Sequence, residues 1–508
     1  MVYTGRPSSG CENCRKAKKR CDEGLPACSR CVRLGKACGG YRDFSQLMFR
    51  DQTASVTRRA SALSDSSTSA SGSGPITRQL TPEKESRARS FFFHHFVTTS
   101  HLIFLEGISP DEFLINSITA CGLAALANRE NDVAGRDLAR RYYVQAISAT
   151  NSALQHPRRV REDNTLVSIY LLGIFERLTW ENRASVQTWK HHVRGSVQVL
   201  QLRGRNQLTT RTGAALFRDI RTNIITNALW CEEELPDFLV RWTQSLEYNE
   251  MHTPGDQLAV LAARAAAIRS AFRTGSKEDR ELAAAASMLE QDLHGWSETM
   301  NATGSMYSFR DTIDWDSSYA WNGTRHEYGI PQAYQHWNIW RSLMILLSRT
   351  QEAVWRRSWP QLTLTPPRPE HFKAARNRMV TEICVGTASA VGNDNIAEPP
   401  HGSISIAYTV ILPLFLAGTC LLEILADPVS SSSGGSRVIQ VDQSFHLNPK
   451  NQFSTQLSWL IQRFDYIADE IGVGWAVPMT KFLSGQGKMF YDLGRSYEPE
   501  IKEKLFDN

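Results

Sequence analysis

The sequence predicts two parts with different folds: a very small metal-stabilised domain and a large all-α domain. Six of the ten cysteines of this 508-residue chain fall between residues 11 and 38. From about residue 83 onward, apolar residues recur at helical spacing and alternating strand patterns are few. A segment as short as 11–38 has almost no hydrophobic core, so we expect a bound metal to drive its folding. The helical part, at about 420 residues, is long enough to bury a large core of its own.

The spacing of the six cysteines is an internal repeat, because a shift of 17 residues carries the first three onto the last three. The pattern reads Cys11-x2-Cys14-x6-Cys21-x6-Cys28-x2-Cys31-x6-Cys38. Such a cluster fits a disulfide framework, an iron–sulfur site or a zinc site. Residues 1–10 lack the apolar stretch of a secretory signal, and ferredoxin spacings such as C-x2-C-x2-C are absent. Zinc remains, because two thiolates three residues apart reach one ion from a single turn.

The number of cysteines predicts how zinc would be held. One tetrahedral zinc needs four thiolates and would leave two cysteines without a role. Two zinc ions need eight ligand positions, which six cysteines fill only if two of them bridge both ions. The repeat favours one bridging cysteine from each half. Such a site has no open coordination position, so the zinc would be structural, contributing roughly 10–16 kcal/mol to folding.

With this motif the chain resembles the fungal binuclear zinc-cluster (Zn2Cys6) transcription factors. Their motif is C-x2-C-x6-C, a loop that usually carries a proline, and C-x2-C-x6-C again; Pro26 stands at the position of that proline. The resemblance implies two short helices around two zinc ions, with Cys11 and Cys28 as the bridging thiolates. The implied zinc ligands are Cys11, Cys14, Cys21, Cys28, Cys31 and Cys38. The alternative is a LIM- or RING-like adaptor, in which the spacing differs.

The two halves of the repeat differ in charge. Five of the six residues between Cys14 and Cys21 are cationic, whereas the matching stretch of the second half holds two cations. Residues 1–50 contain 11 basic and 4 acidic residues, while 51–508 contain 46 basic and 48 acidic ones. The positive charge is therefore local, which is typical of a nucleic-acid contact rather than of a generally basic surface.

The resemblance also implies roles for these cations. In the family, the short helix after the first cysteine pair points its C-terminal end into the DNA major groove. Lys18 stands at the base-reading position, where a lysine can donate to guanine O6 and N7, and Lys19 would assist. Arg15, Lys16 and Arg20 are expected to contact phosphates. The resemblance implies CGG-like triplets as the DNA target. The alternative interpretations of the same run of charges are a nuclear import signal or a solvated face.

The composition predicts three segments: a DNA-binding domain at 5–43, a flexible Ser/Thr-rich linker at 44–82 and a helical domain at 83–508. A coiled coil after the cluster would need several heptads, but Phe44, Leu47 and Met48 give only one turn. The sequence therefore predicts either a monomer or a homodimer formed through the helical domain.

The helical domain reads as a series of amphipathic and buried helices. The most apolar stretch, 404–425, is long enough to span a bilayer, but we expect a buried central helix kinked at Pro413 and no membrane partner. The predicted helices span 83–99, 111–128, 133–155, 163–179, 184–203, 256–272, 278–298, 335–356, 369–391, 404–425 and 453–471.

The helical part also resembles the fungus-specific regulatory domain that follows many zinc clusters. The residues that carry this resemblance are a pattern from His192 to Gly204 and the run from Pro413 to Gly418. Within 189–204 we expect Val193, Val197 and Leu200 to form one buried face and Gly204 to end the helix. No His-Glu-x-x-His, Walker or Gly-x-Ser-x-Gly motif occurs, so we expect no enzyme.

Together these patterns predict a sequence-specific, zinc-dependent transcription regulator of RNA polymerase II genes, located in the nucleus. Its expected partners are double-stranded DNA and transcriptional co-regulators. The main alternative is a zinc-stabilised interaction adaptor with a helical scaffold domain. A third reading, an enzyme targeted by the cluster, lacks catalytic motifs in the sequence.

Overall fold

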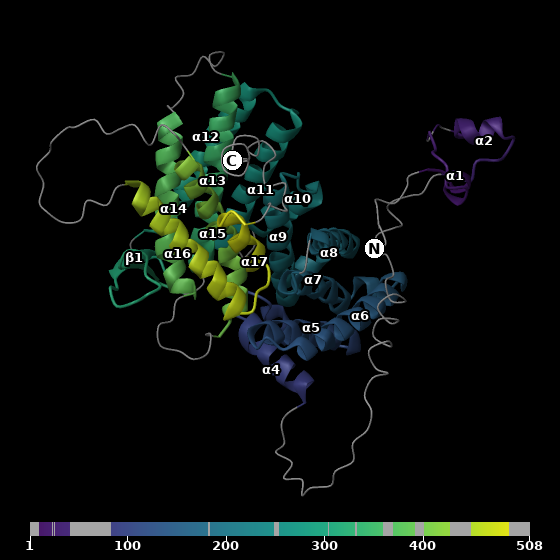
Figure 1. Ribbon diagram of the computed structural model, residues 1–508, viewed down its shortest axis with the longest axis horizontal. Helices are drawn as coiled ribbons and strands as arrows, with labels where there is room; N and C mark the ends of the chain where they lie inside the picture. Colours follow the sequence, from purple (N-terminus) through teal and green to yellow (C-terminus); the bar gives the residue numbers. More distant parts are fainter. Residues whose placement is uncertain are drawn as a thin grey trace, which may run out of the picture. The chain divides into compact units, whose positions relative to one another are not determined.

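The computed structural model describes residues 10–22, 24, 26–40, 83–180, 183–247, 253–302, 304–330, 333–358, 369–391, 401–426 and 449–486. The chain divides into two compact units, Met1–Ser73 and Gly74–Asn508 (Figure 1). The predicted linker, including Phe44, Leu47 and Met48, lies outside the described residues.

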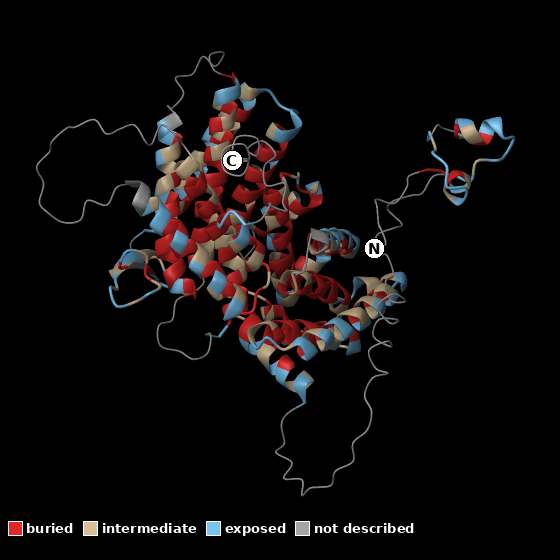
Figure 2. Cartoon of the chain, viewed as in Figure 1, coloured by how far each residue is buried: buried red, intermediate tan, exposed pale blue. Residues whose placement is uncertain are grey.

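The small unit reproduces the sequence repeat in three dimensions. Helix α1 spans Glu12–Lys16 and α2 spans Ser29–Arg33, so each boundary is shifted by 17 residues. The backbone bond from Arg15 N–H to Cys11 O (3.0 Å) recurs as the bond from Val32 N–H to Cys28 O (3.1 Å). Apart from Gly10, the described residues of this unit that are buried are all cysteines, which leaves the fold without an aliphatic core (Figure 2).

The large unit is built from helices, as the sequence predicts. Its α-helices are α4 (Lys84–Phe96), α5 (Glu112–Arg129), α6 (Val133–Gln155), α7 (Asp163–Leu178), α8 (Arg183–Arg203), α9 (Arg211–Cys231), α10 (Asp237–Glu247), α11 (Pro254–Thr274), α12 (Asp279–Met300), α13 (Ala333–Ser358), α14 (Pro369–Val391), α15 (Ser403–Ala426), α16 (Pro449–Asp469) and α17 (Ala476–Leu483). Short 3-10 turns lie at Ile103–Gly107, Arg159–Arg161 and Arg205–Thr209.

Each of the eleven predicted helices is present, with boundaries shifted by a few residues. The expectation for 189–204 is confirmed: Val193 and Leu200 are buried, Val197 is partly buried, and α8 ends before Gly204, whose φ is +76°. The sequence patterns do not predict α9, α10 and α17. In α9 the buried face carries polar side chains, so the apolar spacing is interrupted; these are Asp219, Arg221, Asn223 and Asn227.

Helix α15 forms the centre of the large unit. It contacts α13, α14 and α16, and the ring of its Phe415 stacks on Trp230 of α9 with centroids 5.5 Å apart. By length and composition α15 could cross a membrane, but 67% of its most apolar window is buried inside the protein. The helix continues through Pro413. Its apolar composition is explained by its burial in the core of the large unit.

Among the described residues, the β-sheet consists of one two-stranded hairpin. Strand β1 (Phe309–Ile313) pairs antiparallel with β2 (Thr324–Tyr328), in the register Asp311 opposite His326. The fully buried Arg341 of α13 holds it to the bundle, donating to Tyr328 Oη at 3.1 Å and lying 3.1 Å from His326 Nδ1. Burial, together with the Arg341 charge, lowers the pKa of His326 to about 2, so this histidine is neutral.

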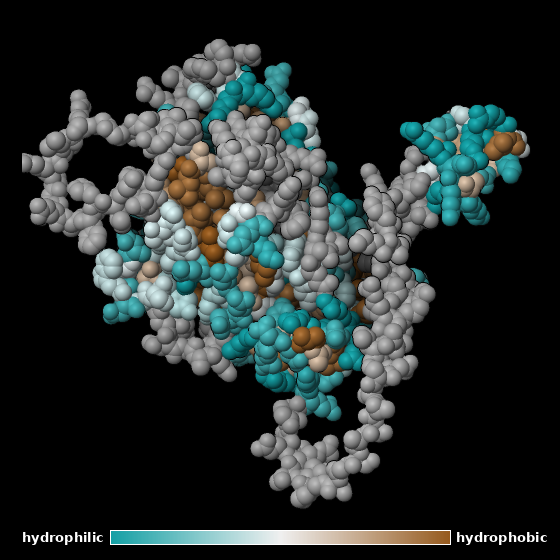
Figure 3. Space-filling view, in the orientation of Figure 1, coloured by the Kyte–Doolittle hydropathy of each residue, from teal (hydrophilic) through white to brown (hydrophobic). Residues whose placement is uncertain are grey.

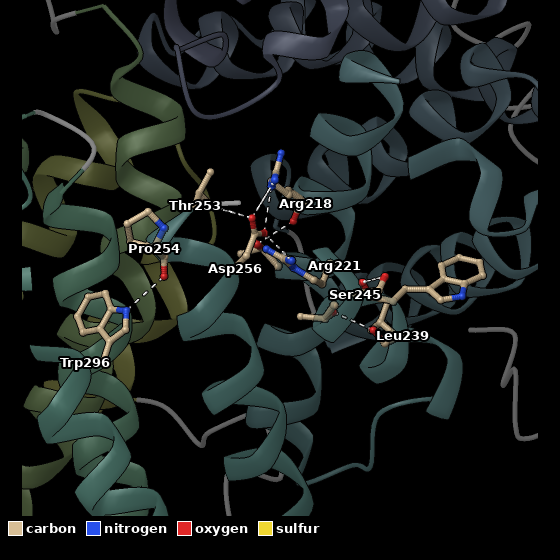
Figure 4. Close-up of polar contacts among 11 residues, drawn as sticks. Arg218, Arg221, Leu239, Ser245, Thr253, Pro254, Asp256 and Trp296 are labelled. Atoms are coloured by element: carbon tan, nitrogen blue, oxygen red, sulfur yellow. Dashed lines mark hydrogen bonds and ion pairs between the residues drawn. The ribbon is translucent and has the colours of Figure 1, made fainter. Parts of the chain in front are cut away.

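Helices α9 and α11 are joined by a buried ion cluster (Figure 4). The Asp256 carboxylate accepts hydrogen bonds from Arg218 Nη2 and Arg221 Nη1, both at 2.8 Å, and from the backbone N–H of Thr253 at 3.0 Å. Asp256 is 0% exposed. Because a buried charge is tolerated only when it is paired and hydrogen-bonded, this cluster fixes how the two helices meet.

Candidate metal centre and nucleic-acid interface

The six clustered cysteines converge on two overlapping sites. Their Sγ atoms form two groups of four, and within each group all the sulfurs lie within 4.8 Å of one another. Both groups contain Cys11 and Cys28. The first group is completed by Cys14 and Cys21, and the second by Cys31 and Cys38.

The sulfur spacing fits zinc. The distance from Cys11 Sγ to Cys28 Sγ is 3.7 Å, that from Cys11 to Cys31 is 3.7 Å, and that from Cys14 to Cys28 is 3.8 Å. Two thiolates bound tetrahedrally to one zinc at about 2.3 Å would lie about 3.8 Å apart, whereas a disulfide requires about 2.05 Å. The cysteines are free thiols, so the donor set and its spacing match the metal.

The local fold places these sulfurs. Cys11 and Cys28 are the N-cap residues of α1 and α2, so each stands at the same point of its half-repeat. Backbone N–H groups point at the sulfurs: Cys31 N–H donates to Cys28 Sγ, and Cys11 N–H to Cys21 Sγ, both at 3.4 Å. Such donors favour thiolates, the form that binds metal.

The predicted DNA-contacting cations lie in the last turn of α1 and in the residues directly after it. Lys16, Lys18, Lys19 and Arg20 are exposed, and Arg15 is half-buried. Lys16 forms an ion pair with Glu12 at 2.8 Å, and this contact lowers the pKa of the Glu12 carboxyl. Within the described residues, no carboxylate pairs with Lys18, Lys19 or Arg20, so these three charges are available to a polyanion.

The backbone of Lys18 lies in a region that lysine disfavours. Its φ is +52°, in the left-handed region. The repeat-equivalent residue of the second half is Gly35, with φ +60°. A non-glycine residue there costs on the order of 1 kcal/mol. The first half therefore bears a conformational cost that the second half avoids by using glycine. The sequence contained this signal, because aligning the two halves sets Lys18 against Gly35.

Sequence reasoning missed the polar contacts that join the two halves. The Asp22 carboxylate accepts a hydrogen bond from the backbone N–H of Ser29, at the start of α2, at 3.1 Å. The Asn13 side chain donates to Ala37 O at 2.8 Å. Neither Asp22 nor Asn13 is a cysteine or a cation, so neither the cysteine spacing nor the charge run marks them.

Comparison with known proteins decides the family. Residues 9–47 match the family model described as fungal Zn(2)-Cys(6) binuclear cluster domain, and residues 79–410 match the fungal specific transcription factor domain. This chain belongs to the fungal zinc-cluster transcription factors. The prediction of a small zinc domain and a large helical domain is thereby confirmed.

Two curated relatives of this zinc-cluster regulator match over short stretches. White-opaque regulator 2 of Candida albicans is 48% identical over 46 residues, which are 9% of this chain and 10% of that protein. Oleate activated transcription factor 3 of Kluyveromyces lactis is 52% identical over 33 residues, 6% of this chain and 5% of that protein. The matches thus span a tenth or less of either relative. No solved structure matches the chain.

Family membership sets the general function. A zinc-cluster regulator binds zinc and DNA and regulates transcription; the family implies a nuclear location, and its members are typically not enzymes. Family membership does not assign base, phosphate or metal contacts to individual residues.

Proposed function

We propose that this zinc-cluster regulator controls RNA polymerase II genes by reading CGG-like triplets in the DNA major groove. The single observation that carries the proposal is Lys18. It is an exposed cation two residues after α1 that pairs with no carboxylate of the described residues, and its backbone conformation costs free energy. Gly35 indicates that the turn takes a left-handed residue, but the turn does not require a lysine, so a cation at this exposed position points to function.

The proposed contacts divide the cations by role. Lys18 donates to guanine O6 and N7, and Lys19 assists it. Arg15, Lys16 and Arg20 contact phosphates and fix the register of the domain on the duplex. Because Lys16 is already paired with Glu12, we expect it to contribute less than Arg20.

The proposed metal centre holds two zinc ions on six thiolates. Cys11 and Cys28 are the bridging ligands in this proposal; the support is that these two sulfurs belong to both groups of four. Bound zinc supplies the cohesion that the small unit lacks, since its interior contains no aliphatic side chain among the described residues. We further propose the division into a DNA-binding domain at 5–43, a linker at 44–82 and a regulatory domain at 83–508.

Selection of bound sites from a random duplex pool, with the zinc-loaded full chain, tests the DNA-reading proposal. We expect enrichment of G·C-containing triplets, and the number and spacing of triplets will report whether the chain binds as a monomer or as a homodimer formed through the helical domain. Recovery of unenriched sequences at every salt concentration would exclude sequence-specific reading.

One observation favours the alternative role of interaction adaptor. On the second half-repeat, Val32 is 65% exposed and Leu34 is 52% exposed, and Figure 3 shows hydrophobic surface on the small unit. If Val32→Ser with Leu34→Ser abolishes regulation while Lys18→Ala leaves it intact, the adaptor role replaces DNA reading. The reverse result supports DNA reading, with co-regulators binding elsewhere on the chain.

A further inference from the structure

Two side chains at repeat-equivalent positions reach across the cluster to a sulfur of the opposite half. Asn13 Nδ2 lies 3.6 Å from Cys31 Sγ, and Arg30 Nη1 lies 3.8 Å from Cys14 Sγ. A shift of 17 residues carries Asn13 onto Arg30 and Cys14 onto Cys31. The same cross-half contact is therefore made twice, in opposite directions, by two different donors.

The hydrogen-bonding capacity of Asn13 shows that its contact is specific. One of its two N–H donors is used by Ala37 O at 2.8 Å, which fixes the orientation of the amide. The second donor is then left facing Cys31 Sγ. Asn13 is partly buried between the halves, so water does not freely replace this contact.

Hydrogen bonds to the cysteine sulfurs come from two kinds of donor, backbone N–H groups and side chains. Cys28 and Cys21 accept from backbone N–H groups at 3.4 Å. Cys14 and Cys31 each accept from a side chain of the other half. A side-chain donor can be removed without changing the backbone, so the sulfurs whose donors can be tested most directly are those of Cys14 and Cys31.

The electrostatics explain why these donors matter. Six thiolates carry a charge of −6, and two Zn2+ supply +4, so the metal core keeps excess negative charge on its sulfurs. A donor beside a thiolate stabilises that negative charge and holds the sulfur in place for the metal. Groups that hydrogen-bond to metal ligands commonly change metal affinity by about 10- to 100-fold.

We propose that Asn13 and Arg30 are positioning residues that hold the thiolates of Cys31 and Cys14 on zinc and thereby slow its release. The inference rests on the two-zinc site proposed above. It concerns retention of zinc rather than the reading of DNA, so this proposal and the proposed DNA-reading function can fail separately.

The test measures zinc transfer from the loaded full chain to a chromogenic chelator. In Asn13→Leu and Arg30→Leu the donor is replaced by an apolar side chain, and we expect zinc release to be about tenfold faster. Arg30→Asn places the donor of the first half at the equivalent position of the second, so we expect release close to that of the native chain. Arg33→Leu removes an exposed charge that contacts no cysteine sulfur among the described residues and should release zinc at the native rate.

Two outcomes would overturn the proposal. Native release rates in both leucine variants would show that the contacts do not retain zinc. Equal acceleration in Arg30→Leu and Arg30→Asn would show that Arg30 acts without donating to Cys14. If Asn13→Leu fails to load zinc, because its bond to Ala37 is also lost, the comparison of the two Arg30 variants still decides. The zinc content of the native chain is measured first: one ion per chain would refute the two-zinc site itself.

Discussion

At the scale of single residues, Lys18 connects backbone conformation to function. Its repeat-equivalent, Gly35, shows that the turn after each short helix takes a left-handed residue, and glycine is the residue that adopts this conformation without cost. A cation at this position weakens the fold slightly and gains a donor at the exposed end of α1. Stability and the proposed DNA reading therefore make opposite demands on Lys18.

This conflict predicts that Lys18→Gly separates the two properties. We expect the zinc-loaded chain to be as stable as the native one or more stable, by up to about 1 kcal/mol, because the strain is relieved. We also expect sequence preference to fall by roughly 1–3 kcal/mol, because the base contact is lost. Competition binding against random duplex measures the preference, and chelator challenge measures the stability of the zinc domain.

The matched control is Gly35→Ala, in which no neighbouring atom lies within 4 Å of the new Cβ. It should lower the stability of the zinc domain through backbone strain alone and leave sequence preference intact. A Lys18→Gly variant that keeps its full preference would contradict the assignment of Lys18 as the base-reading residue.

At the scale of helices, close backbone approach determines how α4 packs on α5. A Cβ at Gly122 of α5 would lie 2.1 Å from Ala88 O, a backbone atom of α4 that cannot move away on its own. The absence of a side chain at Gly122 therefore permits the contact between these helices.

We expect Gly122→Ala to destabilise the helical domain and to loosen α4. Gly295 in α12 is the matched control, because no atom lies within 4 Å of its added Cβ and its backbone is helical. Gly295→Ala should stabilise the domain by about 0.5–1 kcal/mol through helix propensity alone. Denaturant unfolding of both variants measures the difference, and stabilisation by both would rule out the close approach of α4 and α5.

The ion cluster between α9 and α11 predicts a pH dependence. Burial raises the pKa of Asp256, but the hydrogen bonds and charges of Arg218 and Arg221 outweigh it and lower the pKa to about 2. The folded pKa therefore lies below the ordinary value of about 3.9. The stabilisation from this carboxylate is present above pH 4 and is lost as the pH falls through about 2.

Thermal unfolding of the native chain and of Asp256→Asn at several pH values tests this dependence. Near neutral pH we expect the variant to be less stable by about 3–5 kcal/mol, because Arg218 and the buried Arg221 lose the charged acceptor of these hydrogen bonds. The difference should shrink as the pH falls from 4 toward 2. A stability difference that does not change with pH would mean that the charge of Asp256 does not contribute to the stability of the helical domain.

At the scale of the whole molecule, the two units are stabilised by different forces. The small unit has cysteine sulfurs where a core would be, and the large unit has a continuous apolar core that includes Phe415 and Trp230. Loss of metal should therefore affect the two units very differently.

We expect chelation of zinc to abolish DNA binding while the helical signal in circular dichroism is nearly unchanged. The reason is that α1 and α2 contribute 5 residues each to the helical content, and the large unit contains no part of the sulfur cluster. Adding zinc back should restore DNA binding. A large loss of helical signal on chelation would show that the large unit also depends on metal.

The zinc cluster and most of the helices could be predicted from the amino-acid sequence, because both depend on local patterns. Metal-ligand spacing is set within a few residues, and helical periodicity is visible within a window of 11–18 residues. Only the tertiary structure decided the polar part of the core, because those contacts join residues far apart. Helix α9 buries Arg221 only because Asp256, 35 residues away, neutralises it. The reach of Arg30 to Cys14 likewise arises from how the two halves fold together, since the sequence around Arg30 has no sign of this contact.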